Sequence, residues 1–401
     1  MEQALAGVRV LDFTRVLAGP LCTMMLADLG AEIIKIESLI GDETRQWGPP
    51  WAGEGPERQS AYYLSVNRNK RSLALNLKHP AGQQIARDLT AQSQIVVENF
   101  KPGQMAAFGL GYDDLKALNP ALVYGSLTGY GQTGPYAERP GYDYVIQAMS
   151  GLMSITGEPE GEPMKVGVAI SDVIAGLNMS TALLAALRHA EHTGQGQHVD
   201  IALYDTQLSA LVNVASNYLV SGQNPPRYGS QHANIVPYQT FQAQDGAFVV
   251  AVGNDRQFQQ LCHLLGQPDL AHDERFTTNP ARVAHRTELI PLLQSHFSQQ
   301  PVHRWVDGLL ALGIPTGPIH TVEQALNDSQ THARRMIDTV TLSNGESVDL
   351  VASPLKLSAT PPVTRSSPPQ IGQHSGEILS ALLRKTETEI QALLDMGVIG
   401  E

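Results

Sequence analysis

The feature of this sequence that most constrains its fold is a series of short apolar runs separated by helix-length segments. The runs have the length of strands and lie at 8–13, 31–37, 72–77, 95–100, 122–126 and 199–203. The first reads VRVLDF and is almost continuously apolar, which is typical of a strand buried on both faces. Helical segments are expected at 21–29, 80–91, 104–108, 112–118, 173–189 and 206–219. Strands alternating with helices predict an α/β fold whose parallel sheet is covered on both faces.

The character of the sequence changes near Gly222. Residues 222–229 are rich in Pro, Gly and Asn and are typical of a linker. An Asp245-Gly246 turn then joins two strand-like runs, 238–243 and 248–252, and helical segments follow at 257–265, 287–297 and 302–312. Asn344-Gly345 indicates a second hairpin, and two helices are expected near the end, at 376–384 and 387–396. We expect a large domain from 1–220 and 330–401, and a small α+β domain at 225–325.

Composition and charge exclude several classes of partner. The chain has 401 residues and a formal net charge of -12, so its surface repels nucleic acid and anionic membranes. The N-terminus lacks the basic start and apolar run of a signal peptide, and we expect a cytoplasmic protein. Cys22 and Cys262 are the two cysteines, too few and too far apart for a disulfide framework or a zinc site, and both are expected to be buried.

Several common cofactor motifs are missing where they would be needed. No Gly-x-Gly-x-x-Gly turn follows the first strand, so the Rossmann-like large domain lacks the usual dinucleotide site. The sequence also contains no phosphate-binding P-loop and no Gly-x-Ser-x-Gly nucleophile elbow. His189 and His192 have a loose ligand spacing, but they lie on a polar helix end without a set of carboxylate or thiolate ligands, and we predict no metal site.

Asp172 is the most informative single residue. It is the only charged residue between Val166 and Leu187, and it follows a strand-like run at 166–170 where the long helix is expected to begin. A carboxylate there is favoured by the free backbone N–H groups and the helix dipole, so it has two interpretations. It can be an N-cap, or a nucleophile whose pKa is raised by burial and lowered by the helix terminus, and one residue can be both.

A set of motifs spread over the chain resembles the class III CoA transferases, from Leu5 to the C-terminus. These are VLDFTRVLAGP (10–20), LGAEIIKIE (29–37), NRNKRSLALNLK (67–78), VENFKPG (97–103), TGYGQTGP (128–135), GVAISDVIAG (167–176), TGQGQHVDIALYD (193–205) and IGQHSGEIL (371–379). The resemblance implies that Asp172 is a covalent nucleophile that passes through an aspartyl-CoA thioester. It also implies an interlocked homodimer, with CoA thioesters as substrates and no permanently bound cofactor.

The resemblance also implies a set of CoA contacts. They fall on Val16, Leu17, Ala18, Leu75, Asn76, Leu77, Lys78, Asn99, Phe100, Lys101, Tyr142 and Asp143. Lys78 and Lys101 can meet phosphates, and Phe100 can cover the adenine or pantetheine. Formyl-CoA transferases have arginines where this chain has Ser38 and Ala107, so we expect Lys70 or Arg71 to replace them.

Two alternatives remain beside the transferase reading. The same fold hosts 2-methylacyl-CoA racemases, which carry a His at the position of Tyr142. Tyrosine is a poor base at neutral pH because its ordinary pKa is about 10, and this favours a transferase. A non-catalytic acyl-CoA-binding protein is the other alternative, against which Asp172 in its full motif counts.

Segments outside the shared motifs resemble a subgroup that transfers CoA from succinyl-CoA to small dicarboxylic acids. These segments are 42–55, 62–70, 216–222, 232–241 and 253–258. A distal carboxylate needs a cation or a cluster of hydrogen-bond donors. The candidates are Arg45, Arg68, His232 and Gln239, and a structural ion pair is the alternative for each arginine.

Overall fold

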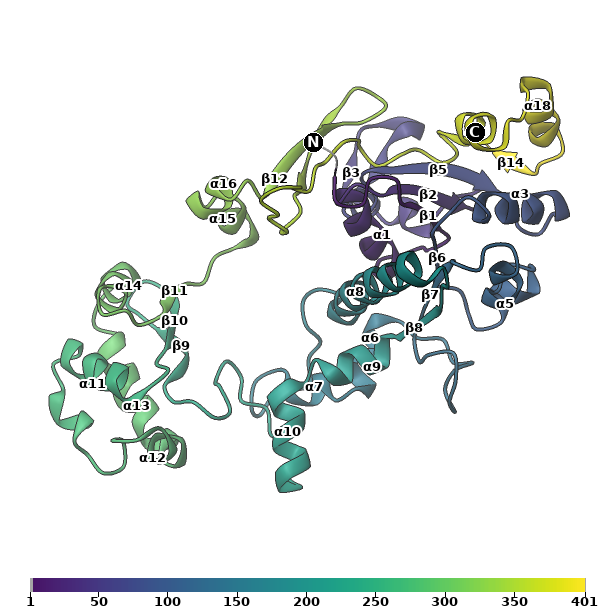
Figure 1. Cartoon of the computed structure of the whole chain (residues 1–401). Helices are drawn as coiled ribbons and strands as arrows, with labels where there is room; N and C mark the ends of the chain where they lie inside the picture. The colour runs from purple at the N-terminus through teal and green to yellow at the C-terminus, as the bar shows by residue number, and fades with distance from the viewer. Residues whose placement is uncertain (1–2, 401) are drawn as a thin grey trace. The chain divides into compact units, whose positions relative to one another are not determined.

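The structure is a computed structural model that describes residues 3–400, and the chain forms two compact units (Figure 1). The larger unit contains the chain up to Ser150, Val166–Leu211 and the chain from Ser329 onward. The smaller unit contains Gly151–Lys165 and Val212–Asp328. Residues 151–165 and 212–220, which we had expected in the large domain, therefore belong to the smaller unit.

The larger unit is built on a seven-stranded sheet with the order β14-β5-β2-β1-β6-β7-β8. The strands are β1 (Arg9–Asp12), β2 (Glu32–Glu37), β5 (Lys70–Leu75), β6 (Ile95–Glu98), β7 (Val123–Thr128), β8 (His198–Ala202) and β14 (Ile399–Gly400). All adjacent strands pair in parallel except β14, which runs antiparallel to β5 at the edge. The prediction of an α/β fold with a mostly parallel sheet is confirmed.

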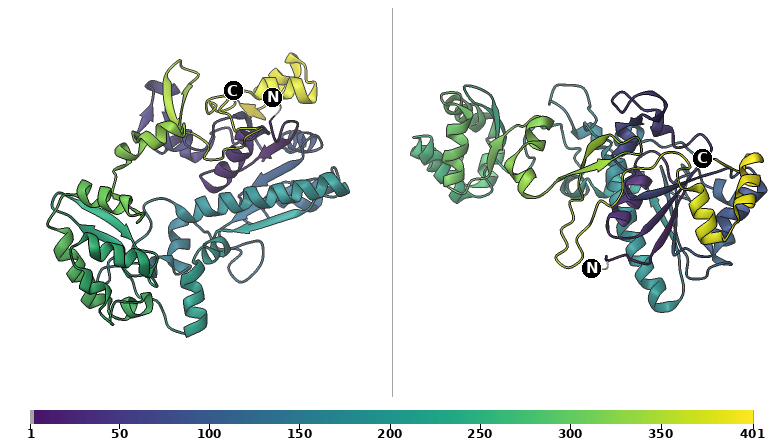
Figure 2. Two further views of the ribbon diagram at one scale, coloured as in Figure 1. Left: turned by 60° about the vertical axis from the view of Figure 1, so that its left-hand side comes forward. Right: turned by 90° about the horizontal axis from the view of Figure 1, so that it is seen from above.

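Each face of this sheet is buried against its own layer of helices. Val10 belongs to one hydrophobic core and its neighbour Leu11 to the other, as the alternation of side chains along a strand requires. On the first face lie α1 (Ala18–Asp28) and α8 (Ile170–Thr193), which pack against each other. On the second lie α3 (Pro80–Thr90), α17 (Ser375–Leu383) and α18 (Glu387–Asp395). Figures 1 and 2 show α8 running along the sheet.

The helix α8 is longer than predicted, and it is the one helix among residues 3–400 long and apolar enough to cross a membrane. Core helices of globular proteins share this property, and the buried face of α8 packs on α1 and β7.

The prediction of a single helix at 206–219 is wrong in one respect. The segment forms two helices, α9 (Leu203–Ser209) and α10 (Val212–Ser221), and Val212, the first residue of α10, has a φ of 44°.

The rest of the larger unit consists of short elements. They are β3 (Trp51–Ala52), β4 (Gln59–Ser60), α2 (Ala61–Leu64), α4 (Gln104–Ala107), α5 (Tyr112–Lys116), α6 (Asp143–Met149), α16 (Ser329–Ala333), β12 (Ile337–Thr341) and β13 (Ser347–Val351), with 3-10 turns at Glu43–Gln46 and Gly55–Glu57. The β12–β13 pair is the hairpin predicted around Asn344-Gly345.

The smaller unit has its own sheet and its own core. Its antiparallel strands are β9 (Tyr238–Gln242), β10 (Ala247–Ala251) and β11 (Thr316–Pro318), so the predicted hairpin is confirmed and a third strand joins it. Its helices are α7 (Leu152–Ile155), α10, α11 (Asp255–Leu264), α12 (Asn279–Ala284), α13 (Arg286–Phe297), α14 (Val302–Ala311) and α15 (Val322–Leu326), with a 3-10 turn at Pro268–Ala271. Cys262 is buried in this core, and Cys22 is buried in the larger unit.

Candidate active site

Asp172 lies in the first turn of α8 and not at its N-cap. The helix begins at Ile170, its N-cap is Ala169, and no side chain caps it. Residues 166–169 form no strand, so the strand-like reading of this run is wrong. The carboxylate therefore lies in the first turn without making the hydrogen bond that an N-cap side chain makes. A carboxylate without this structural role is available for chemistry.

Two contacts hold the first turn of α8 in place. Asp143, in the first turn of α6, accepts a hydrogen bond from the Ser171 backbone N–H at 2.8 Å. The Ser171 hydroxyl donates to Gln207 Oε1 at 2.8 Å. The other Asp143 oxygen accepts from Gln147 Nε2 at 2.8 Å. Asp143 therefore fixes the backbone next to Asp172.

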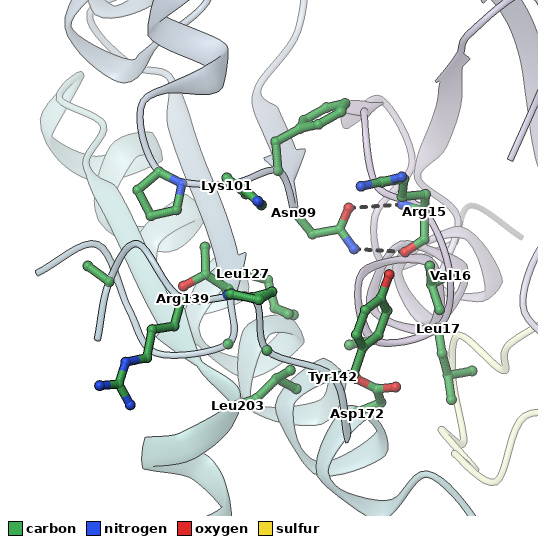
Figure 3. A pocket seen from close by; sticks show the side chains of 18 of the residues that line it. Arg15, Val16, Leu17, Asn99, Lys101, Leu127, Arg139, Tyr142, Asp172 and Leu203 are labelled. Carbon is green, nitrogen blue, oxygen red and sulfur yellow. Dashed lines mark hydrogen bonds between the residues drawn. The ribbon is translucent and has the colours of Figure 1, made fainter. Parts of the chain in front are cut away.

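A pocket of the larger unit brings Asp172 together with three of the predicted CoA-binding segments (Figure 3). The first is the turn after β1, with Val16, Leu17 and Ala18, and the second is the triplet after β6, with Asn99, Phe100 and Lys101. The third is Tyr142, just before α6, whose ring lies close to Asp172 in Figure 3. These residues come from four separate stretches of sequence and meet at the carboxyl ends of the strands, the edge of a parallel α/β sheet where ligands bind.

Two glycines allow backbone segments around the pocket to pack closely against each other. Gly176 follows Asp172 by one helical turn, and a Cβ there would lie 2.7 Å from the Ala18 carbonyl oxygen. Only glycine therefore lets α8 lie this close to the start of α1. In the same way, a Cβ on Gly129 would lie 2.6 Å from the Gly141 Cα, so the loop after β7 packs backbone to backbone against the residue before Tyr142.

The loop after β7 also contains a Gly-x-Gly-x-x-Gly spacing, at Gly129–Gly134. It follows β7, the fifth parallel strand in chain order, and leads into a series of bends and turns. A dinucleotide site uses this spacing to start a helix directly after the first strand. The spacing here serves the close packing against Gly141.

Burial, and after it the neighbouring charge of Asp143, raises the pKa of Asp172 to about 7. The helix terminus does not offset this shift. Near neutral pH the side chain therefore exists in both protonation states, and the ionised form is poorly solvated. A poorly solvated carboxylate is a stronger nucleophile than one surrounded by water.

Several residues of the site were not found by sequence reasoning. Burial, and after it the charges of Asp172, Asp143 and Asp42, raises the pKa of Tyr62 to about 12. Arg15 and Arg139 line the pocket and carry charge that can meet CoA phosphates. In Figure 3 the guanidinium of Arg139 points away from Asp172. A signal was present, because Arg15 and Arg139 lie next to motif residues already selected.

Other predicted residues lie outside this pocket. Leu75 is buried in β5, Leu77 packs on the hydrophobic core, and Lys78 is exposed. The Asn76 side chain donates to the Gly397 carbonyl at 3.2 Å and accepts from the Lys78 backbone N–H at 3.1 Å. This segment therefore does not border Asp172.

The cations expected to replace the two missing arginines are committed elsewhere. Lys70 is 1% exposed, and its ammonium group contacts Asp12 at 3.0 Å and the Pro20 carbonyl at 3.0 Å. Arg71 pairs with Glu32 and Glu377. Neither lines the Asp172 pocket, so we correct that expectation in favour of Lys101 and Arg139, which line it as exposed side chains. Arg15 also lines it, paired with Glu43 at 3.1 Å.

Arg45 is committed to a structural ion pair. It is 8% exposed and binds both oxygens of Glu37, at 2.9 and 2.6 Å. It also donates to the Tyr63 hydroxyl at 2.6 Å and to the Pro369 carbonyl at 3.0 Å. With its donors engaged in this way, Arg45 is not available to a substrate carboxylate, and we keep the structural alternative.

Arg68 is held in the same manner. It is 3% exposed and binds both oxygens of Asp28, at 3.0 and 2.6 Å, and the Val351 carbonyl at 2.8 Å. His232 and Gln239 lie in the smaller unit, where the His232 ring accepts from the Asn234 backbone N–H at 3.0 Å. None of these four acid-binding candidates lines the Asp172 pocket. Within residues 3–400, no group of three or more His, Cys, Asp or Glu side chains could hold a metal ion.

Comparison with known proteins gives a consistent result. Residues 5–375 match the family model for CoA-transferase family III. The chain is 44% identical over 381 residues to the succinate–glutarate CoA-transferase of Agrobacterium fabrum, covering 94% of this chain and 95% of that protein. It is 41% identical over 408 residues to the human succinyl-CoA:glutarate CoA-transferase, covering 99% of this chain and 90% of that protein. A crystal structure of a CaiB/BaiF family protein from Brucella suis superimposes with a TM-score of 0.84 at 44% identity, covering 95% of this chain and 100% of that one.

Proposed function

Because this chain belongs to CoA-transferase family III, we propose that it moves CoA from succinyl-CoA to a small dicarboxylic acid such as glutarate, with Asp172 as the covalent nucleophile. The observation that carries the proposal is the position of Asp172. It is a carboxylate in the first turn of a buried helix, without a capping bond, in a pocket whose other walls are the turn after β1, the triplet after β6 and Tyr142.

The proposed reaction has two mirror-image halves. The Asp172 carboxylate attacks the thioester carbonyl of succinyl-CoA, the CoA thiolate leaves, and a mixed anhydride forms. The thiolate then attacks the Asp172 carbonyl, which releases succinate and leaves an aspartyl-CoA thioester. The acceptor carboxylate attacks this thioester, giving a second anhydride and free thiolate. Attack of that thiolate on the acceptor acyl carbonyl yields the new acyl-CoA and restores the Asp172 carboxylate.

Every step of this route keeps the acyl group activated, so water is the main competitor. Partial burial of Asp172 and the apolar lining from Val16, Leu17 and Leu203 limit the access of water to the anhydride. On the more polar side of the pocket, Arg15, Lys101 and Arg139 supply positive charge for the CoA phosphates. Lys101 and Arg139 are exposed and can reach the phosphates. Pairing with the phosphates holds the CoA molecule so that its thioester lies at a fixed position relative to Asp172.

The test is a covalent trap. The enzyme is incubated with succinyl-CoA, the thioester is captured with hydroxylamine or reduced with borohydride, and peptides are mapped by mass spectrometry. We expect the modification at Asp172. Asp172→Asn keeps the shape of the side chain and removes the nucleophile, so turnover should fall at least about 100-fold while CoA binding survives.

Asp205→Asn is the matched control for this test. Asp205 also lies in the first turn of a helix, α9, but it is exposed and lies outside the Asp172 pocket. Its replacement should leave transfer at the wild-type rate. A label on another residue, or an Asp172→Asn enzyme that keeps more than about one hundredth of wild-type turnover, would contradict the role of Asp172.

The choice of a dicarboxylate is supported by the glutarate-using relatives at 41–44% identity. It is tested by offering the enzyme succinyl-CoA with a series of mono- and dicarboxylic acids and identifying the CoA products by mass spectrometry. Glutarate and its neighbours in length should be the best acceptors. If a monocarboxylate such as butyrate is preferred outright, the dicarboxylate assignment fails and the transferase assignment stands.

We further propose that the protein is a cytoplasmic homodimer with interlocked chains, and that its partners include neither nucleic acid nor membranes. Support for the dimer comes from α10, which has no buried residue. It exposes Val212, Leu219 and Val220 by 65%, 80% and 89%. A monomer rarely leaves so many apolar side chains of one helix in water. Sedimentation over a range of dilutions should give a constant dimer mass, because interlocked chains cannot separate without unfolding.

A further inference from the structure

A pair of buried opposite charges, Lys35 and Asp42, grips the backbone of the turn that follows β1. Both side chains are almost inaccessible, at 0% and 1% exposure, and Lys35 Nζ lies 3.0 Å from Asp42 Oδ2. Lys35 Nζ also donates to the Thr14 carbonyl oxygen at 2.8 Å. The Asp42 carboxylate accepts from the Val16 backbone N–H, with its two oxygens at 3.4 and 3.3 Å. The ion pair thus bonds the turn at two points, two residues apart.

The gripped residue has an unfavourable backbone conformation. Val16 has a φ of 72°, in the left-handed region, where a β-branched side chain is a genuine outlier. Such a conformation persists only where the surroundings impose it. Between the two points held by the ion pair, Asn99 accepts from the Arg15 backbone N–H at 3.0 Å and donates to the Arg15 carbonyl at 2.7 Å. Side chains from elsewhere in the chain therefore hold consecutive peptide groups of this turn.

We propose that Lys35 and Asp42 are positioning residues of the transfer reaction: their ion pair holds Val16 in its left-handed conformation and so fixes the turn that faces Asp172. The proposal rests on the function proposed above, because the turn matters only if the thioester lies between it and Asp172. Lys35 and Asp42 themselves do not line the pocket that contains Asp172, so they act through the backbone of Val16 and its neighbours.

Geometry explains why this grip should affect the rate. Val16, Leu17 and Ala18 lie on the wall of the pocket that contains Asp172, and Ala18 touches α8 at Gly176. If Val16 relaxed to a negative φ, the direction of the chain at Leu17 would change and this wall would move. A displacement of about 1 Å at a reacting centre costs about 100-fold in rate. Substrate affinity, which is spread over many contacts along CoA, should change much less.

The experiment is a double-mutant cycle between Asp42→Asn and Val16→Gly. Asp42 Oδ1 also accepts from the Thr44 N–H at 3.0 Å and from the Thr44 hydroxyl at 2.8 Å. In Asp42→Asn an NH₂ group replaces one acceptor oxygen, so the side chain can no longer accept from Lys35, Thr44 and Val16 together. We expect kcat for folded enzyme to fall at least about tenfold, with KM for succinyl-CoA within about threefold of wild type. Glycine adopts a positive φ without strain, so in the Val16→Gly background the same Asp42→Asn change should lower kcat by less than about threefold.

Two further variants keep the test decisive. Asp28→Asn breaks a comparably buried ion pair, with Arg68, in the same unit, and should leave kcat of folded enzyme unchanged. The side chains of Asp28 and Arg68 bond to each other, to Asn69 and to Val351, and not to the turn. If Asp42→Asn leaves too little folded protein because Lys35 loses its partner, the cycle is run with Lys35→Met and Asp42→Asn together. That combination removes both charges and so avoids an unpaired one.

The outcomes separate the two proposals. Labelling of wild-type Asp172 tests its role as the nucleophile. The double-mutant cycle tests whether the Lys35–Asp42 ion pair positions the turn at Val16. The positioning role would be overturned if Asp42→Asn lowered kcat equally in the wild-type and Val16→Gly backgrounds. It would also be overturned if the Asp42→Asn enzyme kept the wild-type kcat, or if Asp28→Asn lowered kcat as much as Asp42→Asn does. A loss that shrinks in the Val16→Gly background supports it.

Discussion

Removing the charge of Asp143 should move the pH at which the enzyme becomes active. The pKa of Asp172 is raised from 3.8 to about 7, mainly by burial and then by the charge of Asp143. The rise is about 3 units, or ~4 kcal/mol at about 1.4 kcal/mol per unit. Because burial contributes more than Asp143 does, the charge of Asp143 accounts for less than half of it. In Asp143→Asn the pKa of Asp172 should therefore fall by about one unit.

The assay is the pH dependence of kcat/KM for succinyl-CoA, which reports the ionisation of the free enzyme. The nucleophile must be ionised, so activity should rise with pH and reach half of its plateau near the Asp172 pKa, at about pH 7 in the wild type. In Asp143→Asn the half-point should lie at about pH 6, because the ionised form of Asp172 no longer faces a second negative charge. The substitution keeps one oxygen to accept from the Ser171 N–H, so the start of α8 is retained.

Asp143→Glu is the control, since it keeps the charge and should keep the half-point within about half a unit of the wild type. Two results would refute the reasoning. A wild-type profile that is flat down to about pH 5 would show that Asp172 is not raised by burial. A wild-type half-point near pH 7 that Asp143→Asn leaves in place would show that burial alone sets it.

Three further variants test other parts of the site. Arg68→Met leaves Asp28 buried without its partner, so we expect a loss of about 3–5 kcal/mol of unfolding free energy in denaturant titrations, with an unchanged preference for glutarate over butyrate. A changed preference would restore Arg68 as an acid-binding residue. Lys101→Ala should raise KM for succinyl-CoA about three- to tenfold, with little change in kcat, and the increase in KM should be smaller at high salt. An unchanged KM would show that the CoA phosphates bind elsewhere. Gly176→Ala puts a methyl group 2.7 Å from the Ala18 carbonyl, so it should cost about 1–3 kcal/mol in stability and lower kcat, and a neutral result would show that α8 can shift.

The sheet was predictable because strand-length apolar runs and intervening helices are local signals. The break between α9 and α10 was not, because no glycine or proline marks it and Val212 adopts a positive φ there. The start of α8 was misread for a related reason. The run before Asp172 is apolar enough for a strand, but it contains Gly167 and forms no ladder, while its Val166 N–H is taken by Gln147 at 2.9 Å. Side-chain bonds of this kind leave no pattern in the sequence.

The site was predictable where residues of the recognised motifs line one pocket. It was not predictable where a buried arginine pairs with a carboxylate that is distant in the sequence. Asp172, Val16 and Asn99 were selected from their motifs and share one pocket. Arg68 was selected by its charge, which says nothing about its partner, and Asp28 lies 40 residues away. Charge alone cannot distinguish a substrate-binding arginine from a buried structural one. Only the position of the carboxylate that each arginine meets can do so.

The buried charges of the larger unit connect the stability of the fold to the geometry of the pocket. Lys35 on β2 is bonded to Asp42, and Lys70 on β5 is bonded to Asp12 on β1. Burial lowers the pKa of Lys35, but the charges of Asp42 and Asp12 outweigh it, so its pKa is raised and the residue stays charged. Breaking one such pair leaves a buried charge unpaired, at a cost of about 3–5 kcal/mol. Because Lys35 and Asp42 also bond the turn at Thr14 and Val16, breaking this pair would both destabilise the fold and remove two of the bonds that hold the turn.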